Sequence, residues 1–183
     1  MGAKIFTFLD PTVASDARLK ADPIAGSEIA EVRVALRPLR GTPGVGSSTV
    51  TIDAVVRAMS GAEQVRLAGS PDRPVIEAWF KGPGSAEWAA GAVDHACGEV
   101  RRLGGSSPAG AVAEGVEAVA DSGVRVRVGD PTGVADRLIG RAADGQVLLA
   151  GAAWSERRRI QALPSTGTGD APAVPVWILR EVR

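Results

Sequence analysis

The sequence has no tyrosine, and it has one cysteine and one histidine among 183 residues. The single cysteine, Cys97, excludes an intramolecular disulfide and a zinc site built from several thiolates. The histidine, His95, lies two residues before Cys97 in a segment with helical spacing, and side chains two residues apart on a helix point in different directions. We therefore predict that His95 lies at the surface and that Cys97 is a small packed residue, and we do not expect them to form a metal pair.

The sequence also lacks net charge and long apolar runs. Lysine plus arginine and aspartate plus glutamate both number 21, so the basic excess that is typical of nucleic-acid binding is absent. No stretch reaches the roughly 18 apolar residues of a membrane span, and the N-terminus shows no charged-then-apolar signal pattern. We expect a cytoplasmic protein without nucleic-acid or membrane partners, and one domain over residues 1–183.

Short apolar runs alternate with amphipathic segments. We predict strands over 4–9, 63–69, 73–82, 124–130, 145–151 and 174–182. We predict helices over 12–21, 48–61, 85–105, 108–123, 132–144 and 152–163, while 27–41 fits either a helix or a strand. The hairpin predicted from the short link between 69 and 73 favours an α+β sheet over a doubly wound parallel sheet.

Three segments, in this order, resemble the catalytic domains of class III nucleotide cyclases. The segment "FTFLDPTVASDARLKADP" is similar to the family's first strand, which ends in a metal-binding aspartate. Residues 61–96 resemble its second hairpin and Ala-rich helix, and "GVADRLIGRAADGQVLLAG" resembles the helix with the family's asparagine and arginine and the strand after it. The terminal "PVWILREV" is similar to the closing strand. The resemblance implies a ferredoxin-like, nucleotide-cyclase-like mixed sheet in which the strand ending at Asp10 lies beside the hairpin.

The resemblance also assigns metal ligands. Asp10 falls on the first metal-binding aspartate, but the aspartate at the hairpin tip falls on Ser70. Asp72 could replace it only if the tip is remodelled. Two carboxylates are needed to bridge two divalent ions, and a serine hydroxyl brings no charge. We therefore interpret Asp10 as a remnant of a metal site, with a helix N-cap or a turn as the alternative role of this residue.

Other positions carry nucleotide contacts in the family. The purine-reading lysine falls on Arg66 and the transition-state arginine on Arg137, and either guanidinium could grip a phosphate or be an ordinary ion-pair arginine. The family's asparagine falls on Gly133, and the glycine of its phosphate-facing turn falls on Val13. In addition, the resemblance implies that the predicted helix 108–123 is an insertion and that the long arm expected after strand 124–130 is missing. These departures predict lost activity.

The sequence as a whole predicts a catalytically degenerate cyclase-like domain that acts as a regulatory or protein-interaction module in signalling. We expect no enzyme activity and no cofactor, with itself or a related cyclase-like chain as the partner. Four tryptophans in a chain without tyrosine could line such an interface. The alternatives are an active nucleotidyl cyclase, a phosphorus–oxygen lyase that would use Mg²⁺ or Mn²⁺ at a remodelled site, and a non-catalytic sensor of a nucleoside triphosphate.

Overall fold

A computed structural model of the chain describes residues 7–8, 27–36, 49–71, 73–104, 108–119, 125–151, 162–164 and 176–179. Its elements are, in chain order, β1 (Thr7–Phe8), β2 (Ser27–Ala35), α2 (Thr49–Ala58), β3 (Gln64–Ser70), β4 (Arg73–Lys81), α3 (Ser85–Arg102), β5 (Ala109–Val119), β6 (Arg125–Val128), α4 (Pro131–Arg141), β7 (Val147–Ala150), β8 (Ala162–Pro164) and β9 (Val176–Leu179).

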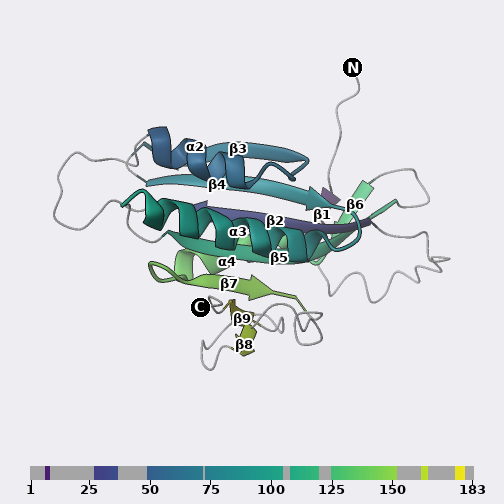
Figure 1. Cartoon of the computed structure of the whole chain (residues 1–183). Helices are drawn as coiled ribbons and strands as arrows, with labels where there is room; N and C mark the ends of the chain where they lie inside the picture. The colour runs from purple at the N-terminus through teal and green to yellow at the C-terminus, as the bar shows by residue number, and fades with distance from the viewer. Residues whose placement is uncertain are drawn as a thin grey trace, which may run out of the picture.

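The strands of the described residues form one mixed sheet (Figure 1). The strand order is β3-β4-β2-β5-β7-β9-β8, and β6 and β1 branch from β5. Strand β2 is central, since it pairs antiparallel with β4 on one side and with β5 on the other. Strands β5 and β7 pair parallel, so the predicted α+β fold with a mixed sheet is confirmed.

Helices α2 and α3 cover one face of the sheet, where the main core lies (Figure 1). Alternate residues of β2 from Ala30 to Val34 point into this core, as does Leu36 just after the strand. They meet Val55 and Met59 from the α2 side and an apolar stripe of α3 that includes Val93 and Cys97. Cys97 is 3% exposed and His95 is exposed, as the sequence predicted.

Helix α4 covers part of the opposite face. Its buried side chains Val134, Ala135 and Leu138 pack on alanines of β5 and on Leu148 and Ala150 of β7. The β5 alanines are Ala109, Ala111 and Ala113. These small side chains let the helix lie close to the sheet over β5 and β7. The rest of this face, over β4 and β3, carries both charged side chains, such as Glu77 and Arg66, and Trp79.

Residues 108–123 were predicted as a helix, and this prediction is wrong. They contain β5, which pairs with β2, β6 and β7. Strand β5 turns back into β6 as an antiparallel hairpin, and α4 follows β6 directly. The chain therefore has a hairpin where the sequence indicated an inserted helix and a missing arm.

The prediction that the strand ending at Asp10 lies beside the hairpin is also wrong. Strand β2 lies beside β4, whereas β1 pairs parallel with β6. Strand β6 pairs with the Val119 end of β5, and the β2 end nearest the hairpin tip pairs with the Ala109 end of β5. Strand β1 is thus at the far end of the sheet from the tip, and Asp10 lies outside the described residues.

The remaining predictions divide by what the structure describes. The helices within 48–61, 85–105 and 132–144 are confirmed as α2, α3 and α4, and the ambiguous segment 27–41 contains a strand, β2. The predicted helix 12–21 lies outside the described residues, as does most of 152–163, whose last two residues belong to β8. In the part of the chain described, no helix is long and apolar enough to cross a membrane.

Candidate functional site

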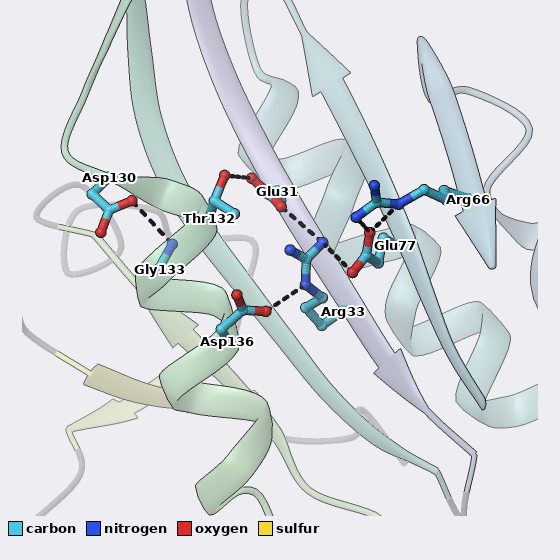
Figure 2. Close-up of polar contacts among 8 residues, drawn as sticks. All are labelled: Glu31, Arg33, Arg66, Glu77, Asp130, Thr132, Gly133 and Asp136. Atoms are coloured by element: carbon cyan, nitrogen blue, oxygen red, sulfur yellow. Dashed lines mark hydrogen bonds and ion pairs between the residues drawn. The ribbon is translucent and has the colours of Figure 1, made fainter. Parts of the chain in front are cut away.

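A cluster of charged side chains lies on the sheet face that α4 covers only in part (Figure 2). The strand registers place Arg33 of β2 opposite Glu77 of β4, and Glu77 opposite Arg66 of β3. Three side chains of alternating charge therefore lie in a row across neighbouring strands. The next row contains Glu31 and Trp79. We call Glu31, Arg33, Arg66, Glu77 and Asp136 the arginine network.

Arg33 is the centre of this network. Its Nη1 lies 2.8 Å from Glu31 Oε1 and 3.5 Å from Glu77 Oε1, and its Nε donates a 2.9 Å hydrogen bond to Asp136 Oδ1 of α4. Arg33 and Glu31 are 2% and 1% exposed. A buried guanidinium needs compensating carboxylates because desolvation of an unpaired charge costs several kcal/mol. Here carboxylates from β2, β4 and α4 supply that compensation.

Arg66 binds the outer side of Glu77. Its Nε donates a 2.6 Å hydrogen bond to Glu77 Oε2, and its Nη2 forms an ion pair with the same oxygen. The guanidinium carbons of Arg66 and Arg33 lie 5.6 and 5.7 Å from the centre of the Trp79 ring, within range of a cation–π interaction. Trp79 therefore packs against both arginines of the network.

The start of α4 is tied to the same network. Thr132 Oγ1 donates a 2.5 Å hydrogen bond to Glu31 Oε2. Two residues earlier, the Asp130 side chain caps the helix by accepting a 3.1 Å hydrogen bond from the Gly133 backbone N–H. A Cβ on Gly133 would lie 2.2 Å from Asp130 Oδ2, so an asparagine at this position would displace the cap. The glycine here leaves room for the Asp130 side chain to cap α4.

The hairpin tip tests whether the described residues fit a pair of divalent ions. Ser70 pairs with Arg73 at the tip, and the neighbouring end of β2 consists of Ala35 and Leu36, whose N–H donates a 3.0 Å hydrogen bond to the Pro74 carbonyl. Leu36 is 2% exposed. Mg²⁺ and Mn²⁺ prefer carboxylate and other oxygen ligands. The described side chains at this end of the sheet therefore do not fit a two-metal centre.

The structure places two of the four site residues that the sequence predicted. Arg66 lies in the arginine network, and Arg137 lies exposed on α4. Arg66 is on β3, whereas α4 packs on β2 and β5, and β4 lies between β3 and β2. Asp10 and Asp72 lie outside the described residues. Among the residues that are described, no group of three or more histidine, cysteine or acidic side chains is placed to hold a metal.

Sequence reasoning missed the central residues of the network. The available signal was Glu77 in the otherwise apolar run "PVIEAWF", together with Glu31 and Arg33 on alternate positions of "AEVRVA". Charges at alternate positions of a buried strand share one face. Opposite charges in two such strands predict an ion pair if the strands are neighbours. The sequence did not show that these strands are neighbours, because residues 27–41 fitted either a helix or a strand.

Comparison of the sequence with protein-family models and with curated proteins finds no match. Comparison of the structure finds guanylate and adenylate cyclase domains. The guanylate cyclase domain of RhGC from Catenaria anguillulae, solved with GTP, matches with a TM-score of 0.54 and 12% identity, over 84% of this chain and 96% of that one. This chain shares the fold of nucleotide cyclase catalytic domains.

Two further structures support the same fold. The dimeric guanylyl cyclase domain of the RhoGC fusion protein from Blastocladiella emersonii matches with a TM-score of 0.52 and 13% identity, over 83% of this chain and 96% of that one. The adenylate/guanylate cyclase/hydrolase from Silicibacter pomeroyi matches with a TM-score of 0.51 and 12% identity, over 86% and 99%. The cyclase-like fold inferred from the sequence is confirmed, and identities this low establish the fold alone.

Proposed function

We propose that this chain is a catalytically inactive cyclase-like domain that serves as a regulatory or protein-interaction module, with itself or a related chain as partner. One observation carries the proposal. The strand beside the hairpin ends in Ala35 and Leu36, and the tip carries Ser70, so the described residues supply no carboxylate pair there.

The chemistry of cyclisation explains why this matters. One divalent ion activates the ribose hydroxyl and another neutralises the leaving pyrophosphate, and carboxylates must hold both ions near the α-phosphate. Three carboxylates on this side of the sheet, Glu31, Glu77 and Asp136 of α4, are each paired with a guanidinium, and Glu117 is paired with Lys81. These pairings compete with metal binding by the same carboxylates. The proposed function therefore does not need a metal cofactor bound by these side chains.

The two alternatives need other residues. An active cyclase would need Asp10 and Asp72 to come together as metal ligands with Arg137 as the transition-state arginine. A nucleotide sensor would need Arg66 and Arg137 to grip one triphosphate. Arg66 is already bound to Glu77 and packed over Trp79. These contacts support the interaction role over nucleotide binding.

Incubation with Mn²⁺ and either ATP or GTP tests the proposal. We expect no cyclic nucleotide above the level of a protein-free sample, because the metal-holding carboxylate pair is lacking. Product is read by chromatography after hours at micromolar protein.

Asp10→Ala and Asp72→Ala serve as matched variants. Turnover by the wild-type chain that disappears in either variant would refute the proposal and establish a remodelled metal site. Turnover that survives both variants would indicate a contaminating enzyme and calls for repurification before the assay is scored.

A further inference from the structure

Strand β3 forms an open edge of the sheet (Figure 1). Within the described part of the chain, it pairs only with β4, so the backbone N–H and C=O groups on its outer side have no strand partner. Most of its side chains are exposed, and Leu67 in the middle is 56% exposed. An exposed edge of this length is a template for pairing with another strand.

Strand β3 carries little of the usual protection against edge pairing, and its one irregular backbone position is Gly69, with a φ of 80°, near the hairpin tip. Proteins guard such edges with lysines, prolines, very short strands or inward-pointing charges. Strand β3 has seven residues, no proline and a single charge, Arg66. The guanidinium of that residue is neutralised by Glu77, to which it reaches back over the sheet, so it places no free charge beyond the outer edge (Figure 2). Among the described residues, none pairs with this outer edge, which carries no free charge.

The sequence of β3 is suited to pairing with itself. Leu67 is the middle residue of Gln64–Ser70. An antiparallel pair with a two-fold axis at Leu67 would place the two exposed leucines opposite each other. Arg66 would then lie opposite Ala68 of the second copy, so that like charges do not meet. The formal net charge of the chain is zero, so no overall repulsion opposes such a pair.

We propose that two copies of this chain associate through their β3 strands, which pair antiparallel about Leu67 and continue the sheet from one copy into the other. An open backbone edge binds an extended strand. Because β3 can pair with itself about Leu67, we take that strand to be β3 of a second copy. This inference names a partner and a surface for the interaction role proposed above. Its failure and the failure of that proposal are distinguishable, since cyclase turnover and β3 pairing are measured separately.

Cysteine cross-linking tests the pairing. In a Cys97→Ala background, Leu67→Cys places two thiols across the proposed axis. We expect mild oxidation to give at least about tenfold more disulfide-linked dimer than in the Trp88→Cys control, whose position is 60% exposed on α3. Non-reducing gel electrophoresis reads the dimer. Preferential cross-linking of Trp88→Cys would instead favour an interface lined by tryptophan, and it would overturn the proposal.

A second variant tests the same contact without oxidation. Leu67→Lys places like charges opposite each other at the axis and should raise the dimer dissociation constant at least about tenfold, as measured by sedimentation or light scattering over a hundredfold dilution. Circular dichroism checks that the variant is folded, and Val116→Lys, at an exposed site on β5, is the matched control. A wild-type chain that is monomeric throughout, or a dimer that Leu67→Lys leaves unchanged, would overturn the proposal.

Discussion

Replacement of Arg33 by alanine is expected to lower the free energy of unfolding by about 3–5 kcal/mol. Glu31 and Glu77, which are 1% and 7% exposed, would remain buried without their shared guanidinium. Asp136 would lose the hydrogen bond that ties α4 to β2. Urea unfolding followed by circular dichroism measures the change, and it should be among the largest of any single substitution on this face.

Two controls separate the buried network from ordinary surface charge. Arg66→Ala removes a guanidinium whose side chain is 59% exposed, and we expect a loss of about 1 kcal/mol or less. A triple variant, Glu31→Leu, Arg33→Met and Glu77→Leu, replaces the buried charges together and should recover part of the loss, because no buried carboxylate is left unpaired there. A loss of under about 1 kcal/mol in Arg33→Ala would contradict this description of the network.

The second large effect is expected in the core, at Gly110 of β5. A Cβ on this glycine would lie 2.6 Å from Val93 Cγ1 of α3 and 3.1 Å from Val147 Cγ2 of β7. Well-packed cores tolerate an added methyl group poorly, at a cost of about 1–3 kcal/mol. Gly110→Ala should therefore lower the midpoint of thermal unfolding, and calorimetry measures the shift.

A double-mutant cycle assigns that loss to the contact with α3. The variant Gly110→Ala with Val93→Ala should be more stable than the sum of the two single changes predicts, because the smaller side chain makes room for the new methyl group. Gly91→Ala is the matched control, since it lies on the exposed side of α3 with no atom within 4 Å, and it should stabilise the helix by about 1 kcal/mol. Additive losses in the cycle would place the strain elsewhere.

The same close packing explains why β5 was mistaken for a helix. Its alanines and glycines have the spacing and composition of a weak helix, and alanine is the best helix former. In the fold, Gly110 accommodates Val93 of α3 on one face, while Ala111 and Ala113 accommodate α4 on the other. Small side chains are thus selected by helices that approach from both sides. Local sequence reasoning has no access to those helices.

The general fold was predictable because two of its segments carry strong local signals. The hairpin β3–β4 and helix α3 have clear turns, alternation and an apolar stripe, and their order supported the cyclase resemblance. The first core strand was not predictable in the same way. An apolar run that ends in Asp10 has the pattern of a metal-bearing strand, whereas β2 carries Glu31 and Arg33 and reads ambiguously as helix or strand. The charged residues of β2 are explained by the pairing of this strand with β4, which places Glu77 beside Arg33.

Manganese binding tests most directly whether this chain can assemble a two-metal centre. Electron paramagnetic resonance measures free Mn²⁺ when the ion is titrated into protein with a 2′,3′-dideoxynucleoside triphosphate, which lacks the hydroxyl needed for cyclisation. Because Arg33 and Arg66 pair with Glu31, Glu77 and Asp136 and Lys81 pairs with Glu117, we predict the same free Mn²⁺ signal as with the nucleotide alone. Additional Mn²⁺ bound by the wild-type chain, and released by Asp10→Ala or Asp72→Ala, would contradict the inactive assignment.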